Sequence, residues 1–280
     1  MKKELFFVIA GFLLALNTYA QKEMDDNLFS VSFGPSIPIG NYGNTNLAND
    51  NAGFAKTGEA IHVSFEHKLN KHFGIAAMLY RQKNSVNTAA MSTQFEGVGF
   101  NNTPPYFSNG STPPPTPTYV YVPNWQFDKD SYYLGGFYAG GVFESPIGKA
   151  KRLSFVAKAM LGVVNATSPE LNGKGNSDTV LVYVNQTKAT AWGCSYLLSA
   201  GLKYRLHNKW NLMFNTEYVG TNSIKFKNVT TSYTLENGYI LTSGGYVPGS
   251  SSYLTTSSKL GAVTQTFQSI NLNLGIGWSF

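Results

Sequence analysis

The feature that most constrains this chain is a period of two in its apolar residues. It recurs in eight runs and is clearest at the end of the chain, where Ile270, Leu272, Leu274, Ile276, Trp278 and Phe280 alternate with Ser, Asn and Gly. Successive side chains of a β-strand point to opposite faces, so each run predicts a strand with one apolar face and one polar face. Several such strands can close into a barrel whose wall is apolar on the outside.

One face is clearly apolar in seven of the eight runs. Besides the last run, these faces are Phe29, Val31 and Phe33; Ile61, Val63 and Phe65; Phe73, Ile75, Ala77 and Leu79; Leu153, Phe155, Ala157, Ala159, Leu161 and Val163; Trp192, Cys194, Tyr196, Leu198, Ala200, Leu202 and Tyr204; and Trp210, Leu212, Phe214 and Tyr218. The run over 131–143 is aromatic and glycine-rich in both phases, so its two faces stay unassigned.

The connections between runs alternate in length. The short ones cover 70–72, 144–152 and 207–209, and the long ones cover about 38–57, 84–129, 165–190 and 221–264. Short turns on the periplasmic rim and long loops on the extracellular rim are typical of outer-membrane barrels. The pattern therefore predicts an all-β fold, an up-and-down antiparallel transmembrane β-barrel of about eight strands. Residues 101–123 are rich in proline and favour extended, polyproline-like loop structure.

A soluble periplasmic β-sandwich would show the same alternation, and two observations argue against it. Charged residues make up 13% of the chain, against roughly 25% in an ordinary soluble domain, so the polar faces are poor in charge for a solvated surface. Large aromatics also stand near the strand ends, where interfacial girdles of a membrane barrel are expected: Trp192, Tyr204, Trp210, Tyr218, Trp278 and Phe280.

The N-terminus has the three parts of a secretory signal peptide. Lys2 and Lys3 precede an apolar run from Leu5 to Leu16, and a small residue at Ala20 precedes the polar Gln21. The apolar run is much shorter than the roughly 20 residues that span a bilayer as a helix. We therefore expect residues 1–20 to be cleaved during export and residues 21–280 to form the barrel domain of a Gram-negative outer-membrane protein.

The final run, with its alternating apolar residues and terminal aromatic, resembles the C-terminal signature of outer-membrane barrels, carried here by Leu272, Leu274, Ile276, Trp278 and Phe280. With the signal peptide and the loop pattern, the chain resembles the outer membrane protein β-barrel domain group, which includes small OmpA-, OmpX-, OmpW- and PorT-like barrels. The resemblance implies this fold, an outer-membrane location and recognition of the last strand by the barrel-assembly machinery. It implies no functional residues.

Four charged residues fall on the polar, inward faces of their runs: Glu66, Lys158, Lys203 and Glu217. Opposite charges inside a narrow barrel are expected to pair, because an unpaired charge away from water is costly. An eight-stranded barrel has an interior just wide enough for side chains to fill it or to hold one small ligand. We expect a lumen ionic cluster that acts as a plug, and the alternative is a salt-sensitive gate.

No catalytic or metal site is predicted. The histidines His62, His67, His72 and His207 lie outside the long loops, whereas barrel enzymes resemble one another in placing a catalytic histidine near the extracellular rim. His67 and His72 lack a third metal ligand nearby. We therefore expect a non-enzymatic protein that has no cofactor and no bound metal.

The expected function is structural, or is binding through the long extracellular loops, with Tyr106, Tyr119, Tyr121 and Trp125 as contact aromatics. The alternatives are a narrow, porin-like pore or transporter of small molecules and a barrel component of a secretion apparatus. Expected partners are outer-membrane lipid, lipopolysaccharide and an extracellular or envelope protein. Basic residues suited to lipid phosphates lie near the predicted outer rim, at Lys56, Arg81, Lys83, Lys129, Lys225 and Lys227. The net charge of +6 is too mild to suggest nucleic acid.

Overall fold

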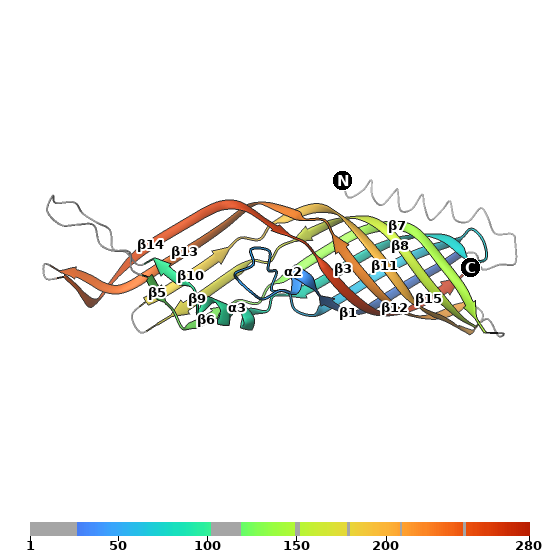
Figure 1. Ribbon diagram of the computed structural model, residues 1–280, viewed down its shortest axis with the longest axis horizontal. Coiled ribbons are helices and arrows are strands. Elements are labelled where there is room, and N and C mark those ends of the chain that lie inside the picture. The colour runs from blue at the N-terminus through green and yellow to red at the C-terminus, as the bar shows by residue number, and fades with distance from the viewer. Residues whose placement is uncertain (1–26, 102–118, 149–151, 178–179, 208, 243–244) are drawn as a thin grey trace.

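The fold is a closed antiparallel barrel that continues into a long sheet at one end (Figure 1). The computed structural model describes residues 27–101, 119–148, 152–177, 180–207, 209–242 and 245–280, so the expected signal peptide, residues 1–20, lies outside the described residues. Around the barrel the strand order is β1-β15-β12-β11-β8-β7-β3-β2. These strands are β1 (Asn27–Pro38), β2 (Gly58–Lys68), β3 (Phe73–Ser85), β7 (Ser131–Ile147), β8 (Leu153–Thr167), β11 (Thr190–His207), β12 (Trp210–Thr221) and β15 (Gln268–Ser279).

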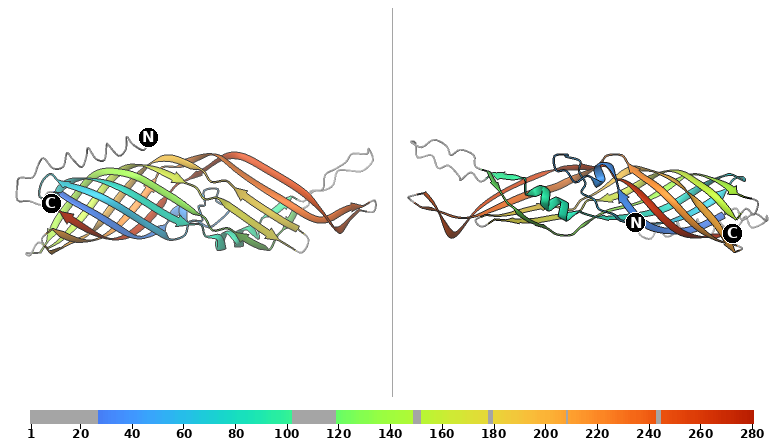
Figure 2. Two further views of the ribbon diagram at one scale, coloured as in Figure 1. Left: turned by 180° about the vertical axis from the view of Figure 1, so that it is seen from behind. Right: turned by 60° about the horizontal axis from the view of Figure 1, so that its bottom comes forward.

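The first and last strands close the barrel. Val31 of β1 lies opposite Ile276 of β15 on one side and opposite Val63 of β2 on the other. Asn27 and Phe280 exchange backbone hydrogen bonds of 3.2 and 3.0 Å, so both ends of the barrel chain meet beside the short turns. We call this the turn end of the barrel and the opposite one the sheet end. Figure 2 shows the same arrangement from behind and from below.

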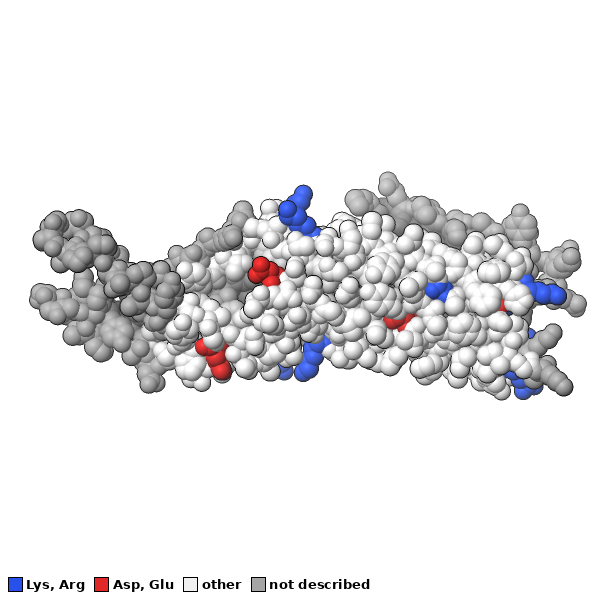
Figure 3. Space-filling model, in the orientation of Figure 1, with Lys and Arg blue, Asp and Glu red and all other residues white. Residues whose placement is uncertain are grey.

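The outside of the barrel is an apolar surface, as the alternation predicts. Its most exposed side chains include Phe33 at 62%, Leu79 at 59% and Leu161 at 75%, while their sequence neighbours point inward. All seven face assignments made from the sequence are confirmed. On the side of the molecule seen in Figure 3, few charged side chains interrupt the barrel wall.

The structure also resolves the faces of β7, which the sequence leaves open. Phe137 is exposed on the outer wall, whereas Leu134, Tyr138 and Glu144 are buried in the interior. The predicted turn 144–152 is wrong at its start, because β7 continues to Ile147 and pairs with β8 up to Leu153. Glu144 is therefore a lumen residue and not a turn residue.

The long connections contain further strands beside those of the barrel. Of the proline-rich segment 101–123, for which extended loop structure is expected, residues 102–118 lie outside the described residues. Five strands from the long connections form a sheet in the order β14-β13-β10-β9-β6. They are β6 (Asn124–Phe127), β9 (Leu171–Asn176), β10 (Val180–Gln186), β13 (Ile224–Thr242) and β14 (Gly245–Gln265). Each begins or ends within a few residues of a barrel strand, so five of the eight barrel strands run on into this sheet (Figure 1). We call it the protruding sheet.

Short elements accompany the protruding sheet and the adjacent rim. They are α2 (Gly40–Gly43), α3 (Thr88–Phe95), β4 (Gly99–Asn101) and β5 (Tyr119–Tyr121), with β4 and β5 paired to each other. Asn87 caps α3 by accepting a hydrogen bond from the backbone N–H of Ala90 at 3.2 Å. Among the described residues, neither helix combines the length and apolar character that would let it cross a bilayer.

Candidate functional site: the lumen and its turn-end pocket

An aromatic cluster closes the sheet end of the lumen. Tyr42 of α2 is 1% exposed, and its ring centroid lies 5.3 Å from that of Tyr132 and 4.9 Å from that of Phe267. Phe226 extends the cluster, at 6.4 Å from Phe267. Tilted and edge-on aromatic contacts at these separations add to the stability that burial provides. We call these four residues the aromatic cap.

A chain of hydrogen bonds runs from the aromatic cap into the lumen. The Tyr42 hydroxyl donates to Asn84 Oδ1 at 3.2 Å, and Gln82 Nε2 donates to the same oxygen at 2.6 Å. Gln82 Oε1 in turn accepts from the Tyr80 hydroxyl at 2.5 Å, and that hydroxyl accepts from Asn271 Nδ2 at 2.8 Å. Polar side chains therefore fill this stretch of the barrel and partly satisfy one another.

At mid-lumen lies Glu217, one of the four charges predicted to point inward. It is 0% exposed and accepts a hydrogen bond from Asn273 Nδ2 at 2.7 Å. His62 Nδ1 lies 3.6 Å from the same carboxylate oxygen. The sequence places His62 on an inward face but does not identify it as a neighbour of Glu217, because register across several strands is needed to bring them to one level.

Two of the four charges predicted to point inward, Glu66 and Lys158, meet directly. Lys158 Nζ lies 2.6 Å from Glu66 Oε1, and the two side chains are 0% and 9% exposed. These residues come from β2 and β8, which are not neighbours in the barrel, so the pair crosses the lumen. An ion pair across the interior fills its width at this level.

Lys203, the fourth predicted charge, pairs with a residue that sequence reasoning missed. Its Nζ donates to Glu144 Oε2 at 2.5 Å, and Lys68 Nζ lies 3.1 Å from the same oxygen. One carboxylate therefore serves two ammonium groups. The direction of the Glu144 side chain could not be predicted, because the two faces of 131–143 are unassigned in the sequence. Lys68 was not predicted to point inward, because it lies at the very end of β2.

Several buried polar atoms of the lumen have no protein partner within the described residues. They include both ring nitrogens of His62, both amide atoms of Asn215, Glu217 Oε1 and Asn273 Oδ1. Buried polar groups in proteins are nearly always hydrogen-bonded, and internal water supplies the missing partners where the site is polar.

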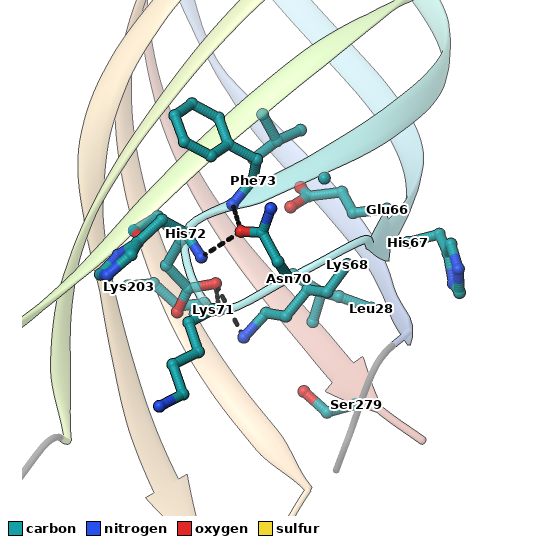
Figure 4. Close-up of a pocket in the computed structure, with 13 residues that line it drawn as sticks. Leu28, Glu66, His67, Lys68, Asn70, Lys71, His72, Phe73, Lys203 and Ser279 are labelled. Carbon is teal, nitrogen blue, oxygen red and sulfur yellow. Dashed lines mark hydrogen bonds and ion pairs between the residues drawn. The ribbon is translucent and has the colours of Figure 1, made fainter.

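A pocket opens at the turn end, beside the Glu144 cluster (Figure 4). We call it the turn-end pocket, and its lining residues are Leu28, Glu66, His67, Lys68, Asn70, Lys71, His72, Phe73, Gly74, Val142, Glu144, Lys203 and Ser279. The lining includes three lysines and two histidines but only two carboxylates. In Figure 4 the His67 ring points away from the other labelled side chains. Most of the lining side chains come from the end of β2, from the turn 69–72 and from the start of β3.

Asn70 builds the turn beside this pocket. Its Oδ1 accepts hydrogen bonds from the backbone N–H groups of His72 and Phe73, both at 2.9 Å (Figure 4). Asparagine side chains commonly stabilise tight turns in this way. His72 Nδ1 lies 3.1 Å from the carbonyl oxygen of Glu144, which anchors the turn to β7. The lysine at the tip, Lys71, is exposed.

The predicted contact aromatics have different environments. Tyr121 is 62% exposed, and Tyr119 lies with it in β5. Tyr106 lies outside the described residues. Trp125 corrects the expectation, because it is only 6% exposed and its Nε1 donates to the carbonyl of Val122 at 3.0 Å.

Trp125 is part of a small hydrophobic core that belongs to the protruding sheet. Its ring lies 5.1 Å from Phe95 of α3 and 5.8 Å from Phe127. The ring also lies over Gly175 of β9, where a Cβ atom would come within 2.6 Å of it. Glycine at this position gives the indole room to lie flat on the sheet. The long connections therefore fold around their own core.

In the part of the chain that the structure describes, no group of three or more His, Cys, Asp and Glu residues could hold a metal ion. His67 Nδ1 lies 2.9 Å from Asn27 Oδ1 and His72 is held to the Glu144 carbonyl, so each imidazole has a local partner. The sole cysteine, Cys194, faces outward from β11.

An apolar belt around a closed barrel, with its polar side chains turned inward, defines an integral β-barrel membrane protein. The sequence matches the family described as "Outer membrane protein beta-barrel domain" over residues 8–280. The chain belongs to this family, and the protein is an outer-membrane β-barrel. No curated protein matches the sequence.

Three solved structures are among those to which the chain is similar. Neisserial surface protein A is 9% identical, with a TM-score of 0.39, and the match covers 93% of this chain and all of that one. A major outer membrane protein from Thermus thermophilus is 13% identical, with a TM-score of 0.40 and 91% and 99% coverage. The outer membrane protease OmpT from Escherichia coli is 9% identical, with a TM-score of 0.28 and 94% and 100% coverage. Our assignment depends on the family and on the barrel itself.

Proposed function

We propose that this protein is a closed, non-enzymatic barrel that holds the protruding sheet outside the cell as a binding platform. The observation that carries the proposal is the filling of the lumen at successive levels. The Lys203–Glu144–Lys68 cluster lies near the turn end, the Glu66–Lys158 pair and Glu217 lie further in, and the aromatic cap closes the sheet end. Side chains that fill the interior leave no continuous path for ions or solutes.

The build of the protruding sheet supports the second half of the proposal. A disordered loop must lose conformational entropy when it binds a partner, whereas a sheet with its own core has already done so. Trp125, Phe95 and Phe127 give this sheet such a core, and α3 packs against its edge. Lys174 of this sheet is exposed, and so is Tyr121 of the separate β4–β5 pair.

Conductance of the purified protein in planar lipid bilayers tests the closed lumen. We expect the wild-type barrel to show no stable conductance steps. A variant in which Glu66, Lys158 and Tyr42 are all replaced by alanine removes one ion pair and the centre of the aromatic cap, and should conduct. Stable steps from the wild type would contradict the proposal and favour the narrow pore. An equally silent triple variant would show that these three side chains are not what closes the barrel.

A further inference from the structure

The residues that line the turn-end pocket carry more positive than negative charge. Glu66 is matched by Lys158 at 2.6 Å, so it adds nothing to the balance. The Glu144 carboxylate then stands against three ammonium groups, those of Lys68, Lys71 and Lys203. Two positive charges remain, without counting the histidines. Lys203 is 7% exposed and already pairs with Glu144, so Lys68 shares a carboxylate that Lys203 neutralises, and an added anion would compensate for the second ammonium group.

The position of the pocket indicates where a compensating anion would come from. Phe73 lines the pocket, is 57% exposed on the outer wall and lies 5.4 Å from the ring of Phe143. Trp210 and Trp278 face outward at the same end of the barrel, opposite each other in the register of β12 and β15. Aromatic girdles of this kind mark the membrane interface, where lipid phosphates lie.

We propose that the turn-end pocket binds a phosphate group. Lysine ammonium groups act as point charges that suit the tetrahedral oxygens of phosphate, and basic pockets beside membrane-spanning elements commonly hold lipid headgroups. Lys68 and Lys71 reach the phosphate from the β2–β3 side, and Lys203 supports it from the lumen. In Figure 4, Lys71 extends from the turn toward the open end of the barrel. The phosphate belongs either to a phospholipid of the adjacent leaflet or to a soluble molecule.

Phosphorus-31 NMR titration of the whole protein in maltoside micelles tests this assignment. The probes are inorganic phosphate, dihexanoyl phosphatidylglycerol and, by competition, acetate. We expect saturable phosphate binding to the wild type, with acetate at least tenfold weaker. Tighter binding of the short-chain lipid than of inorganic phosphate assigns the site to lipid, and the reverse order assigns it to a soluble phosphate. Equal competition by acetate would overturn the choice of phosphate.

A double variant, Lys68→Gln with Lys71→Gln, should bind the preferred probe at least tenfold more weakly, because it loses two charge-assisted contacts. Lys203 still neutralises Glu144 in this variant, so the barrel is expected to fold, which heat-dependent migration on a gel would show. Lys71→Gln alone, on an exposed turn, provides a milder version with a smaller loss. The matched control is Lys225→Gln with Lys227→Gln, two exposed lysines of β13 at the other end. Equal binding by the Lys68 and Lys71 variant and by the control would overturn the proposal, whatever the conductance of the barrel.

Discussion

Lys158 and Glu66 form an ion pair of 2.6 Å across the interior of the barrel, with the lysine side chain fully buried. The two residues lie 92 positions apart in the sequence on strands that do not touch in the sheet. Charges buried in this way stabilise the fold only while both are present, because either one alone would keep its desolvation cost without its partner.

We therefore expect Lys158→Met to lower the free energy of unfolding by about 3–5 kcal/mol, since it leaves the Glu66 carboxylate unpaired. Adding Glu66→Met to the same chain should recover most of this loss. The measurement is urea unfolding of the barrel in lipid vesicles, followed by tryptophan fluorescence. The loss of stability in the double variant is compared with the losses in Lys158→Met alone and in Glu66→Met alone. If it equals their sum, the two side chains do not act as a pair.

The outer wall gives a second prediction, through Leu161 in the middle of β8. Its side chain is 75% exposed in a surface that faces lipid. Leu161→Arg should destabilise the barrel by about 2–4 kcal/mol, because charge at mid-bilayer is costly. The control is Leu206→Arg near the turn end, where the same change should cost at most about 1 kcal/mol. Similar losses at the two positions would mean that the membrane does not cross β8 at Leu161.

The protruding sheet gives a third prediction, through the glycine beneath the Trp125 ring. A Cβ atom at Gly175 would come within 2.6 Å of the indole, so Gly175→Val should displace the ring and loosen this sheet. Limited proteolysis should then cut the segment 119–186 faster, while the barrel keeps its heat-dependent gel migration. Gly261→Ala on β14 is the control, because nothing lies within 4 Å of its added Cβ. Faster cleavage in both variants would argue against a specific role for the indole contact.

Tyr42 in α2 gives a prediction about pH. Burial, together with the neighbouring Tyr132 and Tyr80, raises the pKa of the Tyr42 phenol well above its usual value of 10.0. The native state therefore favours the neutral phenol, and the stability linked to it is complete below about pH 10 and is lost as pH rises further. Tyr42→Phe should cost about 1 kcal/mol at pH 8, because the hydrogen bond to Asn84 is lost.

Above pH 10 this cost should shrink and then change sign, since phenylalanine does not ionise. Unfolding of both proteins in urea at pH 8 and at pH 11 provides the comparison. A cost for Tyr42→Phe that stays the same at the two pH values would show that Tyr42 does not contribute to the alkaline sensitivity of the fold.

The sequence by itself determined the barrel and the orientation of most of its wall. Alternation in runs such as Phe29 to Phe33 is a local property, because successive residues of a strand must point to opposite faces and lipid accepts only apolar side chains. The same alternation predicts that four charged side chains point inward: Glu66, Lys158, Lys203 and Glu217.

Only the tertiary structure decided which of these charges meet, since pairing across a lumen depends on register accumulated over several strands. The tertiary structure also placed Glu144 inside the barrel. The sequence could not show which face of β7 points inward, because aromatic and glycine residues occupy both phases of 131–143. The burial of Trp125 could not be predicted from the local sequence pattern either. The indole is covered because β9 presents Gly175 beneath it and α3 brings Phe95 against it, and these contacts join segments whose order in the sequence does not reveal that they pack together.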